Sequence, residues 1–373
     1  MGRSPDILSD TRPKTNLEVG DRLPPLSWRD HAGNRLSLSE DRFGGRTTVL
    51  LLCSLPEDVE GQERLRRFAG RHAVFQALGT QAFIVIGGNA PSFEAFAGTC
   101  AGGIPIVSDR AGSLDRAFGL GTETQANWCV VVLDECHRIE RLIDCPAESD
   151  PADAALAHCA TRRRSEGLGP RHPPVLVLPN LITAEHCRRL IAAWEAGSRY
   201  QGGVASAKSG HEVETAIKIR EDLALPDRSA EAQELFAAFR RRLFPEVARN
   251  FHYQITRAET LRLGCYHAEA GGSFKAHRDD SSPAVRHRAF AMSLFLNTGA
   301  YRGGTLRFPE YGPEDYNPPA GSAVVFSCSL LHEVTPVTEG RRFGLFGFFH
   351  GEAEEAERRA NGAPYEYTRV DQP

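Results

Sequence analysis

The chain has 373 residues, of which 41% are apolar and 25% charged, and its formal net charge is −4. This length exceeds the usual size of one domain and predicts two, while the weak acidity gives no electrostatic footprint for nucleic acid or an anionic membrane. No apolar stretch approaches a membrane span, and the first residues form no signal peptide, so we expect a cytoplasmic protein without nucleic-acid or membrane partners.

The first part of the chain alternates apolar runs with amphipathic segments. Residues 1–16 are polar and aperiodic and are expected to be disordered. Continuous apolar runs predict strands at residues 47–53, 82–86, 104–107 and 129–133. A further strand at residues 138–143 is expected to form a hairpin with the strand at residues 129–133. Helical spacing predicts helices at residues 60–78, 91–99 and near 113–118. This order predicts a thioredoxin-like α/β domain over residues 17–145.

This predicted domain resembles the peroxiredoxin family. The similar motifs are Gly20-Asp21-x-x-Pro24, the segment 104–109 and the segment 116–119. The family carries a nucleophilic cysteine in a Pro-x-x-x-Thr-x-x-Cys loop, but residues 56–63 of this chain contain no cysteine. Cys53 is the nearest thiol and ends an apolar strand among acidic neighbours, where a thiolate is disfavoured. We therefore expect a degenerate domain without peroxidase activity.

The composition changes after this domain. Residues 146–172 are rich in Ala, Pro, Asp and Arg without a sustained apolar stripe, and we interpret them as a linker before a second domain at residues 173–373. That domain is expected to begin with a strand at residues 175–178. Thr183 and Ser229 each precede a segment with helical apolar spacing and are predicted N-caps. The two helices should flank a β core formed by residues 261–349.

Three candidate metal ligands lie in this β core. His277 and Asp279 are two residues apart near the end of a predicted strand, so their side chains share a face. His332 follows the apolar run 323–326, fifty-three residues after Asp279. Two imidazoles and one carboxylate on one side of a metal leave the opposite positions open, which suits Fe(II) in oxygenases. Arg342 opens an apolar strand ten residues after His332, and a guanidinium enclosed there needs an anion.

With Tyr266, eleven residues before His277, these residues resemble the Fe(II)/2-oxoglutarate-dependent dioxygenases of the prolyl 4-hydroxylase-like branch. The resemblance covers about residues 175–351. It implies that the β core is a double-stranded β-helix (jelly roll), that His277, Asp279 and His332 bind iron, and that Arg342 and Tyr266 bind 2-oxoglutarate. It also implies O2 as cosubstrate, ascorbate as a candidate reductant, and iron-centred chemistry without a separate acid or base.

The resemblance further implies that the enzyme hydroxylates an unactivated C–H bond while 2-oxoglutarate is decarboxylated to succinate. Halogenating relatives carry a small residue in place of Asp279, so hydroxylation is expected. We expect an amino-acid-like substrate of the free proline or pipecolate type. Arg220, Arg286 and Arg288 are candidate ligands of its carboxylate, although residues 218–222 also fit a salt-bridged surface strand.

Several alternatives stay open from sequence alone. The enzyme could instead hydroxylate prolyl residues of a peptide or protein, with the first domain recruiting that partner. The iron site could belong to a non-catalytic redox or iron sensor. A thiol peroxidase that depends on Cys53 is a third reading, and the sequence also allows a homodimer.

Overall fold

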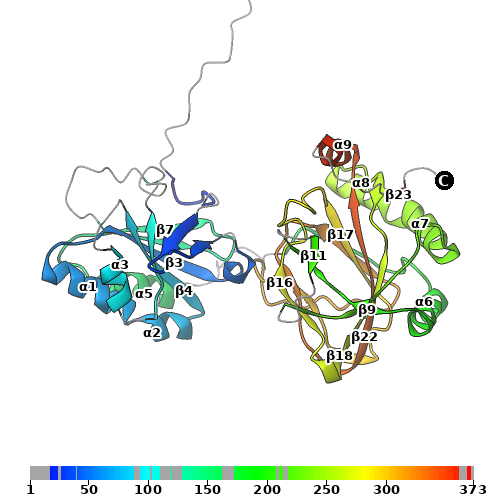
Figure 1. Cartoon of the computed structure of the whole chain (residues 1–373), viewed down its shortest axis with the longest axis horizontal. Helices are drawn as coiled ribbons and strands as arrows, with labels where there is room; N and C mark the ends of the chain where they lie inside the picture. The colour runs from blue at the N-terminus through cyan, green and yellow to red at the C-terminus, as the bar shows by residue number, and fades with distance from the viewer. Residues whose placement is uncertain are drawn as a thin grey trace, which may run out of the picture. The chain divides into compact units, whose positions relative to one another are not determined.

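The structure is a computed structural model and describes residues 17–23, 27–38, 40–87, 93–100, 103–109, 118, 128–161, 172–206, 210–212, 217–360 and 368–370. The expected disordered start at residues 1–16 and most of the helix expected near residues 113–118 lie outside these ranges. The chain divides into two compact units, residues 1–167 and 168–373 (Figure 1). No helix among the described residues is long and apolar enough to cross a bilayer.

The first unit is a seven-stranded mixed sheet in the order β2-β1-β5-β4-β3-β6-β7. Its strands are β1 (Ser27–Asp30), β2 (Arg35–Ser37), β3 (Thr47–Ser54), β4 (Thr80–Gly87), β5 (Ile106–Asp109), β6 (Trp128–Leu133) and β7 (Ile139–Cys145). Its described helices are α1 (Val59–Ala69), α2 (His72–Ala77), α3 (Phe93–Thr99) and α5 (Pro151–Thr161), with a 3-10 turn at Asp41–Phe43. Strands β3, β4 and β5 are parallel and the β6-β7 hairpin is antiparallel. The thioredoxin-like prediction is confirmed.

Two expectations for the first unit were wrong in detail. The helix expected over residues 60–78 is two helices, because α1 ends at Gly70, whose N–H bonds to the Arg66 carbonyl, and α2 restarts at His72. The linker expected over residues 146–172 contains α5, which buries Ala152 and Ala155 completely in the core of the first unit. Alanine packs closely but forms no conspicuous apolar stripe, so the composition resembled that of a linker.

The described residues of the second unit form two large sheets and a separate two-stranded sheet, β10-β11. The smaller of the two large sheets has the order β12-β16-β21-β19, and the main path of the larger one is β8-β20-β17-β22-β15-β13-β9. The strands are β8 (Val175–Leu178), β9 (Tyr200–Gln201), β10 (Val204–Ser206), β11 (Gly210–Glu212), β12 (Lys218–Ile219), β13 (Glu221–Ala224), β14 (Arg257–Ala258), β15 (Arg262–His267), β16 (Ser273–His277), β17 (Phe290–Phe295), β18 (Tyr301–Gly303), β19 (Leu306–Arg307), β20 (Ala323–Ser327), β21 (His332–Val334), β22 (Val337–His350) and β23 (Thr368–Arg369). The helices are α6 (Ala184–Ala196), α7 (Ala230–Arg242), α8 (Phe244–Phe251) and α9 (Glu352–Ala360), with a 3-10 turn at Ala268–Ala270.

Side chains of both sheets share buried clusters, such as Leu306 of β19 with Phe295 of β17, and Val334 of β21 with Phe346 of β22. Two antiparallel sheets that enclose a common core are the layers of a jelly roll, so this part of the fold prediction is also confirmed. Sheets of this type bury alternate residues of each strand on the inner face. The inner face is therefore where a site between the sheets has to be built.

The helices α6 and α7 cover the outer face of the larger sheet (Figure 1). As predicted, Thr183 Oγ1 accepts the N–H of His186 and Ser229 Oγ accepts the N–H of Ala232, which caps both helices. Trp194 of α6 packs edge-on against Phe343 of β22, with ring centroids 5.2 Å apart. Since neighbouring residues of a strand point to opposite faces, Phe343 on the helix side places Arg342 between the sheets.

Candidate metal and cosubstrate site

The three predicted metal ligands meet at the end of the β16-β21 pair. His277 of β16 lies directly opposite His332 of β21 in the antiparallel register, after an irregularity between Phe274 and His277. Asp279 follows β16, and its N–H bonds to the Cys328 carbonyl at 2.9 Å, which holds the segment beside the neighbouring chain. One ligand atom from each of the three side chains lies within 4.8 Å of the other two.

Each imidazole is oriented by its own backbone. His277 Nδ1 lies 2.7 Å from the Lys275 carbonyl and His332 Nδ1 lies 2.9 Å from the Leu330 carbonyl. A proton on Nδ1 of each ring leaves the Nε2 lone pair for a metal, as in most protein metal sites. These Nε2 atoms lie 3.4 Å and 3.3 Å from the two carboxylate oxygens of Asp279.

Burial and proximity set the charge states that metal binding requires. Burial lowers the pKa of His332 to about 4, and the neighbouring His277 adds to this effect, so the imidazole of His332 is neutral at pH 7. Burial alone would raise the pKa of Asp279, but His332 and His277 outweigh it and hold that pKa below its ordinary value. A neutral imidazole and an ionised carboxylate are ready to bind a divalent cation without losing a proton.

The residues present fit a ferrous ion. The donor set is two imidazole nitrogens and one carboxylate on one side, which leaves open positions for other ligands. His277 Nε2 is buried and has no hydrogen-bond partner among the described residues, as expected of an atom reserved for a metal. Phe274 stacks on the His277 ring at a centroid distance of 3.4 Å and limits its rotation.

Arg342 of β22, in the same unit, is a completely buried cation. Its Nη2 donates to Ser293 Oγ at 3.4 Å, while Nε and Nη1 have no hydrogen-bond partner within the described part of the chain. Its guanidinium carbon lies 5.1 Å from the ring centroid of Tyr266 and 4.9 Å from that of Phe295. A buried charge with open donors and aromatic walls is stable only with an anionic partner.

Tyr266, the second residue assigned to 2-oxoglutarate, is also completely buried. It lies directly opposite Arg342 in the register of β15 and β22. Its hydroxyl accepts a hydrogen bond from Arg220 Nη1 at 3.3 Å. Arg342 and Tyr266 therefore form one wall between the sheets, with donors for one carboxylate.

The three candidate substrate arginines have different surroundings. Arg288 is buried and donates to both oxygens of Glu259, at 2.6 and 2.7 Å, and to the Asp279 carbonyl at 3.4 Å. Arg220 is buried and donates to both oxygens of Asp222. Arg286 is exposed. The structure thus gives Arg288 and Arg220 carboxylate partners from this chain, and the expected surface strand at residues 218–222 is salt-bridged but buried.

Sequence reasoning missed Phe274, Ser293 and Glu259. Phe274 stood in the alternating segment before His277, and its spacing could have indicated a contact with that ligand. Ser293 and Glu259 gave no such signal, because their partners Arg342 and Arg288 lie 49 and 29 residues away in the sequence.

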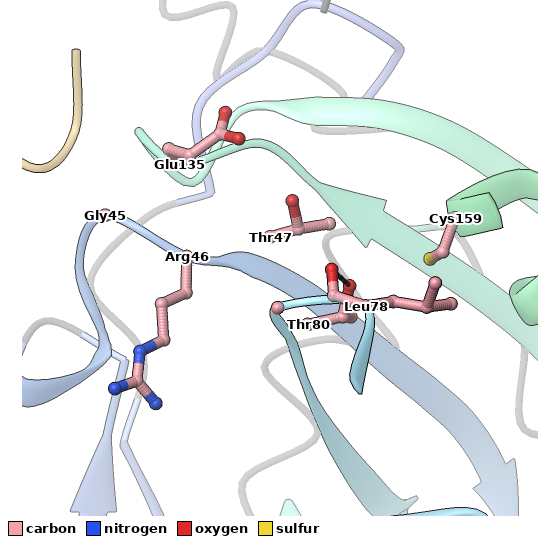
Figure 2. A pocket seen from close by; sticks show the side chains of 8 residues that line it. Gly45, Arg46, Thr47, Leu78, Thr80, Glu135 and Cys159 are labelled. Carbon is pink, nitrogen blue, oxygen red and sulfur yellow. Dashed lines mark hydrogen bonds between the residues drawn. The ribbon is translucent and has the colours of Figure 1, made fainter. Parts of the chain in front are cut away.

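In the first unit, Cys53 is buried at the end of β3, and this burial raises the pKa of its thiol far above the ordinary value. The described residues of this unit also line a hollow of about 310 Å³, formed by Gly45, Arg46, Thr47, Leu78, Gly79, Thr80, Glu135 and Cys159. It lies where β3 and β4 begin, at the opposite end of β3 from Cys53, and its two charged side chains point away from each other (Figure 2). These features supply no activated thiol.

Comparison with known proteins gives matches for the second unit. The family model of the 2OG-Fe(II) oxygenase superfamily matches residues 261–350. A PKHD-type hydroxylase of Pseudomonas aeruginosa is 30% identical over 189 residues, which cover 46% of this chain and 76% of that protein. A prolyl-4-hydroxylase structure from Pseudomonas putida is 21% identical and covers 53% of this chain and 98% of its own, with a TM-score of 0.37.

A peroxidoxin structure from Mycobacterium tuberculosis is 19% identical and covers 40% of this chain and 100% of its own, with a TM-score of 0.35. Two imidazoles, a carboxylate and a buried guanidinium stand inside the segment that the superfamily model matches. Through its second unit, this chain belongs to the 2OG-Fe(II) oxygenase superfamily and is a hydroxylase.

Proposed function

We propose that this hydroxylase acts on an unactivated C–H bond of an amino-acid-like small molecule of the proline or pipecolate type. In this proposal His277, Asp279 and His332 hold Fe(II), and Arg342 with Tyr266 holds the distal carboxylate of 2-oxoglutarate. One observation carries it: Arg342 is a buried cation with two open donors in the same core as a three-residue ligand set. The three-residue ligand set alone would also fit a structural metal site, and a buried arginine alone would not indicate an enzyme.

Fe(II), 2-oxoglutarate and O2, when bound, supply the oxidation that places a hydroxyl on carbon while the keto acid becomes succinate and CO2. The chain's own residues supply position and a dry environment. Arg342 can donate two parallel hydrogen bonds to one carboxylate, and this bidentate pair fixes the orientation of the diacid. The rings of Tyr266, Phe295 and Phe346 around that guanidinium exclude water and strengthen the ion pair.

Two further contacts keep the ligands in place. The stacked Phe274 ring restrains His277, and Arg288 connects the Asp279 carbonyl to the buried Glu259 carboxylate. Restraint of this kind keeps metal ligands in a productive geometry and commonly matters nearly as much as the ligands themselves. Arg288 thus acts in this proposal as a positioning residue for Asp279.

The test is a mass-shift screen of free amino acids and prolyl peptides with Fe(II), 2-oxoglutarate, O2 and ascorbate as reductant. We expect a gain of one oxygen on a free amino acid, matched by stoichiometric succinate. His277→Ala should lose both metal binding and succinate formation. Arg302→Met, which removes an exposed guanidinium from the same unit, is the matched control and should keep both.

Other results would select the alternatives. Oxidation of the prolyl peptides alone would favour a peptide or protein hydroxylase. Metal and 2-oxoglutarate binding without succinate formation under any substrate would favour a sensor and contradict the proposal.

A further inference from the structure

The second unit buries a small ionic cluster next to the proposed site. Lys218, Arg220 and Asp222 are 4%, 6% and 1% exposed. Arg220 donates to both oxygens of Asp222 at 2.5 and 2.9 Å, and Lys218 Nζ lies 3.2 Å from the second of these oxygens. Arg220 and Lys218 therefore share one carboxylate, and the cluster has an excess of one positive charge whenever Lys218 is protonated.

The cluster touches both parts of the proposed site. Lys218 lies on β12, the edge strand of the smaller sheet, opposite Phe274 of β16. Its Nζ is 5.3 Å from the centroid of the Phe274 ring, and that ring stacks on His277. On the other side, Arg220 donates to the Tyr266 hydroxyl beside Arg342. One aromatic ring separates Lys218 from the ligand His277.

Two glycines allow this cluster to be enclosed. A Cβ on Gly202 would lie 2.5 Å from Asp222 Oδ2 and 2.8 Å from Lys218 Nζ. A Cβ on Gly264 would lie 2.8 Å from both Arg220 Cδ and Asp222 Oδ1. Backbone thus closes on the charges from β15 and from the residue that follows β9, and only residues without a side chain fit there. A surface salt bridge needs no such accommodation.

The charges of the proposed site leave this excess uncompensated. Divalent iron, the Asp279 carboxylate and a 2-oxoglutarate dianion together carry one negative charge, which Arg342 neutralises. The positive charge of the cluster is then left over. The nearest further groups do not remove it, because Arg262 is also positive and the Glu221 side chain is 45% exposed, where water screens its charge. A buried excess charge is unfavourable unless a ligand brings the opposite one.

Lys218 has a donor to spare and, unlike Arg220, is not fixed by a bidentate pair with Asp222. An ammonium group has three hydrogens, and two acceptors are described for Lys218 Nζ, Asp222 Oδ2 and the Gly203 carbonyl. Burial lowers the pKa of Lys218 to about 7, with Arg220 adding to this effect and Asp222 opposing it. An anion beside Lys218 would restore the charged ammonium.

We propose that Lys218 binds the carboxylate of the substrate, which makes this enzyme selective for free carboxylic acids over neutral amides and peptides. This inference rests on the proposed function and names the residue that decides its substrate class. It assigns to Arg220 a different role from the one expected, since Arg220 holds Asp222 and Tyr266. A prolyl residue inside a peptide has no carboxylate to offer at this position.

The test measures binding without turnover. The full chain, loaded with Mn(II) and 2-oxoglutarate without O2, is titrated calorimetrically with the proteinogenic amino acids and L-pipecolate, and with the primary amides of those that bind. We expect at least one acid to bind and its amide to bind at least 30-fold more weakly. Lys218→Met should weaken the acid to the level of the amide, while Arg302→Met should leave both unchanged.

Two readouts separate this role from a structural one. The affinity of Lys218→Met for 2-oxoglutarate should stay within threefold of that of the unmodified chain, which shows that the site is intact. At pH 8, acid binding to the unmodified chain should take up close to one proton, measured as the dependence of the binding enthalpy on the buffer's ionisation heat. This uptake should vanish in Lys218→Met.

The inference is overturned if no acid binds, if amides bind as well as acids, or if Lys218→Met keeps the preference for acids. These failures differ from failure of the proposed function. Succinate formation driven only by prolyl peptides would leave the hydroxylase and remove the Lys218 role. Acid binding that depends on Lys218 without succinate formation would leave the anion site and remove the hydroxylase of amino acids.

Discussion

Replacing Arg342 by methionine should make the metal-free protein more stable while it removes 2-oxoglutarate binding. The guanidinium is completely buried, donates one long hydrogen bond to Ser293, and leaves Nε and Nη1 without a partner among the described residues. Methionine has a similar length and suits an aromatic surround. The substitution therefore removes an uncompensated charge without opening a large cavity.

Two opposing effects set the magnitude. The three aromatic rings around the guanidinium stabilise it by about 2 kcal/mol each, the magnitude for a cation shielded from water. Burying a charge without a partner costs several kcal/mol, and each open donor adds roughly 1–3 kcal/mol of unfavourable free energy. The unfavourable effects are larger, so we expect Arg342→Met to raise the free energy of unfolding by about 1–3 kcal/mol.

The effect on the cosubstrate has the opposite direction. Truncating one partner of a buried ion pair weakens binding by about 2–5 kcal/mol. At about 1.4 kcal/mol for each factor of ten, the dissociation constant of 2-oxoglutarate should rise by roughly 30-fold to 3,000-fold. Metal binding by His277, Asp279 and His332 should persist.

The assay is urea unfolding of metal-free protein, followed by the fluorescence of Trp194 in a chain that carries Trp28→Phe and Trp128→Phe. Trp194 belongs to the second unit and the other two tryptophans to the first. Arg288→Met is the matched control, because Arg288 is also buried but pairs with Glu259. Leaving Glu259 without its partner should lower the free energy of unfolding by about 3–5 kcal/mol.

Equal destabilisation by the two substitutions would refute the reasoning. It would mean that Arg342 already has an anionic partner within the chain and that no diacid is needed beside it. Unchanged 2-oxoglutarate affinity in Arg342→Met would contradict the assignment of the pocket.

Three further predictions follow from the same geometry. Burial would raise the pKa of Glu259, but Arg288 and His287 hold it well below its ordinary value. The ionised Glu259 therefore stabilises the folded protein fully above about pH 4.5, and this stabilisation is lost as the pH falls further. In Glu259→Gln, the free energy of unfolding measured in urea should decrease less with acidification than in the unmodified chain. Burial raises the pKa of Cys53, so its thiol should not reduce hydrogen peroxide. With dithiothreitol as reductant, the unmodified chain and Cys53→Ser should consume hydrogen peroxide at the same rate. A rate that depends on Cys53 would support the thiol peroxidase hypothesis. Gly264→Ala puts a Cβ 2.8 Å from Arg220 and Asp222, so thermal unfolding should show a loss of about 1–3 kcal/mol, and a neutral result would mean that the cluster is loosely packed.

Local patterns explain why much of the fold was predictable from sequence. Thr183 and Ser229 cap helices through contacts only three residues long, and apolar runs such as Thr47–Ser54 need both faces of a sheet covered. The ligand pair His277 and Asp279 is local in the same sense, since strand periodicity alone puts both on one face. His332 was a candidate because it follows the apolar run 323–326, and in the structure it lies opposite His277 in the strand register.

The roles of the buried arginines could not be predicted from sequence, because they depend on how the fold arranges their partners. Arg288 was a candidate substrate ligand because its carboxylate partner is not close to it in sequence, whereas residues 218–222 left a substrate role and a salt bridge both open for Arg220. Arg288 is held by Glu259, 29 residues earlier, and by the backbone of Asp279. Arg220 had its partner Asp222 only two residues away, but the bidentate geometry and burial of that pair come from the fold around Gly264.

The same distinction separates binding cations from structural ones. Arg220, Arg288 and Arg342 are all buried in the second unit, and two of them have a carboxylate of the chain as partner. A carboxylate within the chain compensates a buried cation without a ligand, whereas Arg342 has no such partner among the described residues, and in the proposed function 2-oxoglutarate supplies it. Burial therefore does not identify the functional cation. The absence of a carboxylate partner is what distinguishes Arg342 from the other two arginines. This absence can be recognised only from the folded arrangement of β15, β17 and β22.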